Sequence, residues 1–125
     1  MVDSGDPINH INDATAKHPV HLIKVLDDSV VPNSSTDRLI AAGGMRKLVD
    51  LGPNPVGAND GVNDDADGAG YTFFSQGSHG SLFDPTASLA ATVEMQKQTI
   101  KFAASANAPG GPFVILEDPT VLDLN

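Results

Sequence analysis

Two apolar runs with the spacing of β-strands stand out from the mixed pattern of the chain. The first spans residues 20–26, where valine, leucine and isoleucine are nearly continuous and Lys24 is the one charged interruption. Such a run predicts a parallel strand covered on both faces, with Lys24 directed along a strand edge or toward the following loop. The second run, residues 71–75, is rich in aromatic and β-branched residues and also predicts a strand.

Each predicted strand is followed by a helical pattern, and the first begins near Asn33. Either Asn33 or Ser34 can cap this helix, and Asp37 stands three residues after Ser34 in capping-box spacing. The pair Gly43 and Gly44 is expected to end the helix, because glycine readily adopts the left-handed conformation of a helix C-terminus.

The strongest helical pattern follows the second strand. Asp84 is the expected N-cap, Pro85 takes the first helical position, and the helix is expected to run to about Ala106. Apolar residues at helical spacing are expected on the buried face, and charged or amide residues on the solvent face. The expected buried positions are Leu89, Val93, Ile100, Ala103 and Ala104, and the expected solvent positions are Glu94, Lys97, Gln98 and Lys101.

The remaining segments carry weaker patterns. One or two helical turns are expected within residues 9–16, a short helix or strand within 45–51, a loop over 52–70, and a short strand or a tail at 113–116. Alternation of strands and helices predicts an α/β fold with a parallel sheet. The length of 125 residues fits one domain.

Composition excludes several classes of function. The formal net charge is −9, so the surface repels phosphates and nucleic acid is not an expected partner. The chain has no cysteine, which excludes disulfides, thiolate metal sites and a cysteine nucleophile. No apolar run approaches the roughly 18 residues of a membrane span, and the first residues lack the basic and apolar regions of a signal peptide.

Both predicted strands lead to a side chain that is common in catalysis. Asp28 follows the first strand, and His79 lies between Gly77 and Gly80 after the second. Parallel strands place such residues along one edge of the sheet, so we expect them to be close. The imidazole of His79 can accept and return a proton near pH 7. The carboxylate of Asp28 would accept its Nδ1–H and stabilise the imidazolium.

The two loops resemble the acid-bearing and histidine-bearing loops of α/β-hydrolases. In the first, Val-Leu-Asp-Asp-Ser-Val-Val-Pro at 25–32, Asp28 rather than Asp27 aligns with the acid, because it lies two residues before the Val-Val pair. In the second, Gln-Gly-Ser-His-Gly at 76–80, His79 aligns with the base. The order of acid and then histidine also matches that fold.

Longer strings at 31–39 and 77–82 resemble the C-terminal part of large bacterial extracellular lipases, and the resemblance covers residues 7–125. It implies that residues 1–125 are the C-terminal fragment of an α/β-hydrolase domain. It also implies that the parent is a serine-type lipase or esterase, secreted or held in the cell envelope, which hydrolyses lipid or other ester substrates.

The chain departs from that family in one decisive respect, because it has no Gly-x-Ser-x-Gly nucleophile elbow. Ser78 is adjacent to His79 and cannot easily point at its ring, so it is interpreted as a loop serine. We therefore expect a chain that is inactive alone and lacks the N-terminal half of the hydrolase. The sheet edge exposed by that loss predicts self-association.

The alternative is a non-enzymatic α/β interaction or calcium-binding module. On this interpretation Asp28 is a turn or capping residue and His79 an ordinary loop histidine. His10, His18 and His21 show no ligand spacing and are interpreted as surface or strand-end residues.

The acidic loop at 58–70 is the only calcium candidate. Asn63, Asp65 and Asp67 match the first half of an EF-hand loop, but Phe74 stands at the twelfth position, where the bidentate glutamate belongs. A solvated insertion is therefore the preferred interpretation, and no cofactor is expected.

Overall fold

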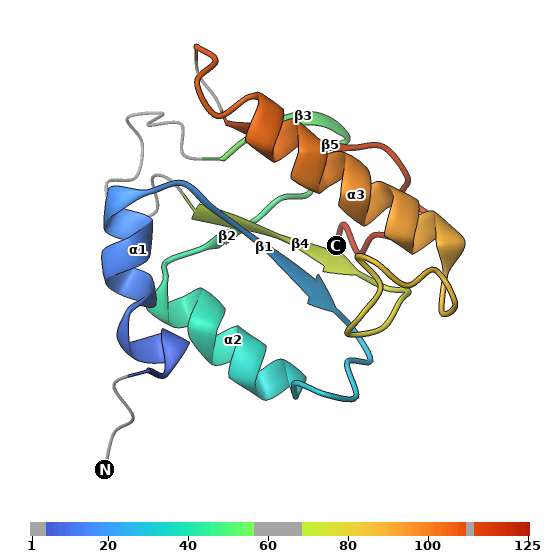
Figure 1. The fold of residues 1–125 in the computed structure, drawn as a ribbon, viewed down its shortest axis with the longest axis horizontal. Coiled ribbons are helices and arrows are strands. Elements are labelled where there is room, and N and C mark those ends of the chain that lie inside the picture. Colours follow the sequence, from blue (N-terminus) through green and yellow to red (C-terminus); the bar gives the residue numbers. More distant parts are fainter. Residues whose placement is uncertain (1–4, 57–68, 110–111) are drawn as a thin grey trace.

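The computed structural model describes residues 5–56, 69–109 and 112–125, which form a mixed α/β structure (Figure 1). In chain order the elements are the 3-10 helix η1 (Pro7–Asn9), α1 (Ile11–Lys17), β1 (Val20–Val25), α2 (Asn33–Ala42), β2 (Arg46–Lys47), β3 (Gly52–Pro55), β4 (Ala69–Phe74), α3 (Leu89–Ala104) and β5 (Phe113–Leu116).

The main sheet contains β1, β4 and β2, all parallel, with β4 in the centre. β1 pairs with β4 from Val20 opposite Ala69 to Val25 opposite Phe74, so the two strands end at the same level. The expected parallel α/β layer is confirmed at this coarse level, and the loops that follow β1 and β4 leave from one edge.

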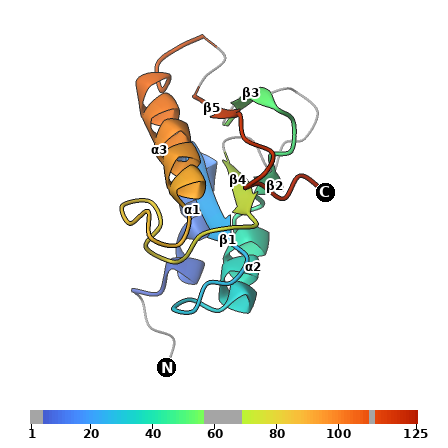
Figure 2. The same cartoon turned by 90° about the vertical axis from the view of Figure 1, so that its right-hand side faces the viewer.

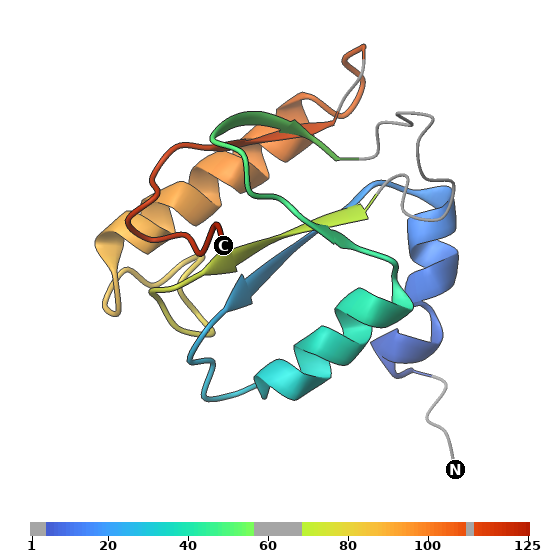
Figure 3. The ribbon, with the colours of Figure 1, turned by 180° about the vertical axis from the view of Figure 1, so that it is seen from behind.

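A second, two-stranded sheet pairs β3 with β5 in antiparallel register, Gly52 opposite Leu116 and Pro55 opposite Phe113. Seen from behind, this ribbon lies apart from the main sheet and beside α3 (Figure 3). The prediction of a loop over 52–70 is therefore wrong at both ends, since 52–55 form β3 and β4 begins at Ala69. Proline at two of the four β3 positions concealed the strand, because proline is tolerated only where its missing N–H is not required.

α3 and α2 lie on opposite sides of the β1–β4 pair (Figure 2). Successive side chains of a strand point to opposite faces, and the α3 face of β4 carries the fully buried Thr72 and Phe74. The core is concentrated on this side. It contains Val25, Leu48, Val56, Phe74, Ala91, Met95, Val114, Leu116, Val121 and Leu122.

The predicted start and buried face of α3 are both wrong. The helix begins after Ser88, whose hydroxyl caps the N–H of Ala91 at 3.2 Å, whereas Asp84 accepts the N–H of Thr86 in a local turn. Leu89, Val93 and Ile100 are exposed, whereas Ala91, Thr92, Glu94, Met95 and Gln98 are buried.

A buried hydrogen-bond chain accounts for the reversed face of α3. The Thr72 hydroxyl donates to Gln98 Oε1 at 2.9 Å, and Gln98 Nε2 donates to Glu94 Oε1 at 3.1 Å. Glu94 Oε1 also accepts the N–H of Glu117 at 3.0 Å. Since buried polar groups cost little only when they are bonded, these partners fix which side of α3 faces the sheet.

The same series of hydrogen bonds begins at His21, whose Nε2 lies 3.2 Å from the Thr72 hydroxyl. The ring centroid of His21 lies 5.9 Å from that of Phe102. Burial lowers the pKa of His21 from 6.5 to about 4. His21 lies near the start of β1, as the strand-end interpretation has it, but its side chain is half-buried against Thr72 and Phe102 rather than free at the surface.

The predicted capping of α2 is also wrong. Pro32 is the N-cap, no side chain caps the helix, and the Asn33 amide donates instead to the carbonyl of Leu26. Asp37 pairs with Lys24 at 2.6 Å, so Lys24 reaches across to α2 rather than along the strand edge. The left-handed glycine at the end of this helix is confirmed, with Gly44 at φ 61°.

Candidate active site

The backbone that follows β1 holds the carboxylate of Asp28. Its Oδ1 accepts the N–H groups of Val30 and Val31, both at 2.8 Å. This turn uses one carboxylate oxygen and leaves Oδ2 available. The Asp28 side chain is 14% exposed, so it lies in a largely enclosed position at the end of the sheet.

Ser81 is fully buried and anchors the loop after β4 through hydrogen bonds. Ser81 Oγ accepts the N–H of Ser78 at 2.7 Å, and the Ser81 carbonyl accepts the Thr92 hydroxyl at 2.6 Å. Gly77 adopts φ 118°, a left-handed conformation that side chains disfavour. These contacts attach the His79 loop to α3.

The two loops bring Asp28 and His79 into direct contact. His79 Nδ1 lies 2.9 Å from Asp28 Oδ2, and the parallel register of β1 and β4 is what places both loops at one edge. An ionised carboxylate only accepts hydrogen bonds, so Nδ1 carries the proton and Nε2 of a neutral ring carries the lone pair. The His79 side chain is 49% exposed. No hydrogen bond within the described part of the chain occupies its Nε2.

Asp28 remains ionised at neutral pH. Its partial burial acts to raise the pKa, but the hydrogen bonds from His79, Val31 and Val30 outweigh that effect and leave the pKa below its ordinary value. The pair thus combines an anionic acceptor with an oriented imidazole, which is the arrangement that a general base requires.

A hollow of about 280 Å³ adjoins this pair. Asp28, Ser78 and His79 line one end of it. Its other walls are apolar and come from β1, α2, the His79 loop and α3, with Leu22, Ile23, Leu39, Leu82 and Met95 among the lining residues. The imidazole therefore borders an apolar space as well as solvent.

Among the described residues no serine hydroxyl is hydrogen-bonded to His79. Ser78 makes its hydrogen bonds with Ser81, including an Oγ–Oγ contact of 3.3 Å, and none links it to His79 among the described residues. Without a hydroxyl at Nε2, the pair can orient and transfer a proton but cannot form an acyl intermediate.

Sequence reasoning expected Asp28 and His79 to lie close together but missed the residues that hold them. The two valine N–H groups act through the backbone, so their side chains gave no signal. Ser81 and Thr92 bond across 11 residues, from the His79 loop to α3. The only sequence signal for Ser81 and Thr92 is weak: each is a small polar residue, Ser81 beside the histidine loop and Thr92 in an amphipathic helix.

No metal site is evident in residues 5–56, 69–109 and 112–125, where no three histidine or acidic side chains group to hold an ion. The calcium candidates Asn63, Asp65 and Asp67 lie outside the described residues. None of the helices in the described ranges is long and apolar enough to cross a membrane.

Comparison of the chain with protein-family models, with curated proteins and with solved structures found no match.

Proposed function

We propose that this chain supplies the acid and the base of a serine-type carboxylic ester hydrolase, as the C-terminal part of an α/β-hydrolase domain. Asp28 is the orienting acid and His79 the general base, and the nucleophilic serine comes from residues outside this chain. The observation that supports the proposal is the 2.9 Å contact of His79 Nδ1 with Asp28 Oδ2, which leaves Nε2 without a partner among the described residues.

The first half of the proposed chemistry, which forms the acyl-enzyme, proceeds in two proton transfers. His79 Nε2 takes the proton of the serine hydroxyl while the serine oxygen attacks the ester carbonyl, and Asp28 stabilises the resulting imidazolium. The imidazolium then gives the proton to the leaving alcohol as the carbon–oxygen bond breaks. Water repeats the sequence on the acyl-enzyme and releases the acid. The apolar hollow beside His79 suits the hydrocarbon part of a lipid or other ester substrate.

The resemblance of both loops to those of extracellular bacterial lipases supports a secreted or cell-envelope location for the parent protein. A non-enzymatic α/β interaction module is the second candidate. It is favoured by the open edge of β1, which has one strand partner among the described residues.

Ester hydrolysis by this chain and by a longer expression product separates the two candidates. The coding region before residue 1 is sequenced, expressed with this chain and assayed on a nitrophenyl ester beside the chain alone. We expect a Gly-x-Ser-x-Gly motif in the added region, turnover by the longer product and none by the chain alone. His79→Ala and Asp28→Asn should each reduce that turnover by orders of magnitude. Turnover that survives His79→Ala, or a longer product without the motif, would refute the proposal.

A further inference from the structure

The outer edge of β1 presents backbone groups that no described residue pairs with. Leu26 donates its N–H to the carbonyl of Phe74 at 2.9 Å, which fixes the alternation along the strand. Leu22 and Lys24 therefore direct their backbone groups toward β4, and His21, Ile23 and Val25 direct theirs away from it. Among the described residues β1 pairs with β4 alone, so these N–H and C=O groups face no other strand.

β1 lies at the bottom of a groove between α2 and α3, called the trench below, and is not a fully exposed sheet edge. Leu22 and Ile23 are consecutive and point to opposite faces of the sheet, yet both line the hollow of about 280 Å³ beside His79. The hollow therefore wraps around the strand edge. Leu39 of α2 forms one wall and Met95 of α3 forms the other, so both helices extend past the strand.

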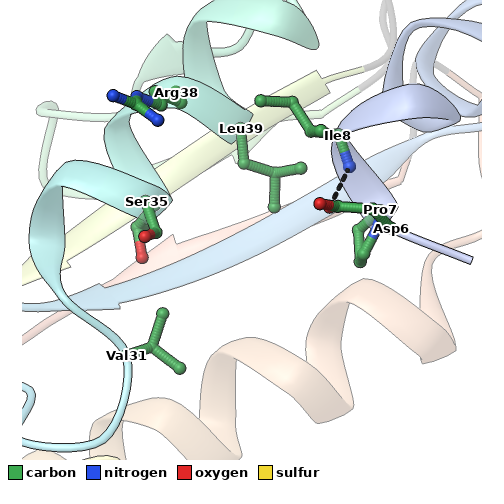
Figure 4. Close-up of a pocket in the computed structure, with 8 residues that line it drawn as sticks. Asp6, Pro7, Ile8, Val31, Ser35, Arg38 and Leu39 are labelled. Atoms are coloured by element: carbon green, nitrogen blue, oxygen red, sulfur yellow. Dashed lines mark hydrogen bonds between the residues drawn. The ribbon is translucent and has the colours of Figure 1, made fainter. Parts of the chain in front are cut away.

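A second hollow adjoins the first on the α2 side, although no residue of β1 lines it. This second hollow, of about 350 Å³, lies between η1 and α2 and shares Val31, Thr36 and Leu39 with the first. In the close-up, Leu39 lies between Ile8 and Val31 and faces this space, whereas the Arg38 side chain lies on the far side of α2 from Asp6 (Figure 4). In the hollow beside β1, the charged or titratable side chains are confined to the Asp28–His79 end.

We infer that this trench binds one extended segment of another polypeptide, which adds to the sheet through the backbone of His21, Ile23 and Val25. The segment carries apolar side chains toward both walls and has no charge at its centre. It spans about five or six residues, because β1 itself has six.

Along β1 the unpaired backbone favours a peptide strand, whereas the hydrocarbon of the proposed ester substrate belongs at the Asp28–His79 end of the hollow. A lipid chain would cover the outward N–H and C=O groups without bonding them, which costs free energy for each group. A strand bonds them and fills the apolar walls at the same time. β1 also lacks the usual protection of an edge, since it contains no proline and its one charged residue, Lys24, is paired with Asp37 on α2.

A second copy of this chain fits the trench poorly. Its own β1 lies between its own α2 and α3, so the helix walls of two copies would meet before their strands could pair. Two copies, each with a net charge of −9, also repel. The same charge attracts a segment with basic flanks, which completes the description of the partner.

The test uses a synthetic nine-residue peptide in which five alternating valines and alanines lie between two pairs of lysines. Its partner control is the same peptide with the five central amides N-methylated. We expect the first peptide to slow amide hydrogen exchange at His21, Ile23 and Val25, with Leu22 and Lys24 unchanged because they already bond to β4. The methylated peptide should give no slowing.

Ile23→Pro should weaken binding of the peptide about tenfold or more, because it removes an outward N–H and leaves the bonds from β1 to β4 intact. The matched variant Ile23→Val keeps the donor and should bind as the original chain does. If Ile23→Pro does not fold, the methylated peptide still tests the same donors. The peptide assay needs no ester turnover, so its outcome is read apart from that of the proposed catalysis.

Three results would overturn the inference. They are an absence of slowing at millimolar peptide, slowing at residues outside β1, and slowing without peptide that grows with protein concentration. The last would assign the edge to a second copy of the chain.

Discussion

Folding stability should fall as the pH drops from about 6.5 toward 4, because His21 is neutral in the folded protein. Its Nε2 lies 3.2 Å from the Thr72 hydroxyl, and that hydroxyl already donates its hydrogen bond to Gln98 Oε1. Nε2 is therefore the donor, and the neutral Nε2–H form satisfies the contact. Burial lowers the pKa of His21 from 6.5 to about 4.

The direction and size of the effect follow from proton binding. Between pH 6.5 and pH 4 the unfolded chain binds a proton at His21 that the folded chain does not bind, so acid favours unfolding. The shift from 6.5 to about 4 corresponds to about 3 kcal/mol when fully expressed, of which about 2 kcal/mol is already lost at pH 5. Carboxyl groups whose pKa is lowered in the folded protein, such as Asp28, also stabilise it, but that stabilisation is lost only at a pH below their unfolded pKa near 3.8.

Urea unfolding at pH 7.5 and at pH 5.0 measures the loss. For the original chain the free energy of unfolding should fall by about 2 kcal/mol more than for His21→Gln, which cannot titrate. His18→Gln is the matched control, since it makes the same replacement at an exposed position at the end of α1. An equal fall in the original chain and in His21→Gln would refute the assignment of a neutral, partly buried histidine.

Two further substitutions test how the His79 loop is held. Gly77→Ala should destabilise the chain by about 1–2 kcal/mol in thermal or urea unfolding, because Gly77 has φ 118° and an added Cβ would lie 3.1 Å from Ser81 Oγ. Gly80→Ala, where a Cβ meets nothing nearer than 4.0 Å, should cost far less, and equal losses would contradict the strain argument. Thr92→Val should cost about 1–3 kcal/mol and shift the NMR signals of the His79 loop, because it leaves the Ser81 carbonyl unbonded. Thr99→Val removes only a bond within α3 and should not move those signals.

The parts of the fold that could be predicted from sequence are those encoded by neighbours in the chain. The apolar run that forms β1 and the aromatic run in β4 are local signals, and so is the glycine that ends α2. Because parallel strands in register end together, the closeness of Asp28 and His79 followed from those two strands and the residues just after them. β3 gave no such signal, since its strand character depends on pairing with β5, about 60 residues later.

The buried face of α3 could not be predicted from its own periodicity, and the error bears on the site. Val93 and Ile100 form an apolar stripe, but the helix turns that stripe outward so that Gln98 can bond Thr72 on β4. The same rotation brings Thr92 under the carbonyl of Ser81. Had the apolar stripe faced the sheet, α3 would be rotated about its axis and Thr92 would lose its position under that carbonyl. The polar chain in the core therefore also determines how the His79 loop is supported.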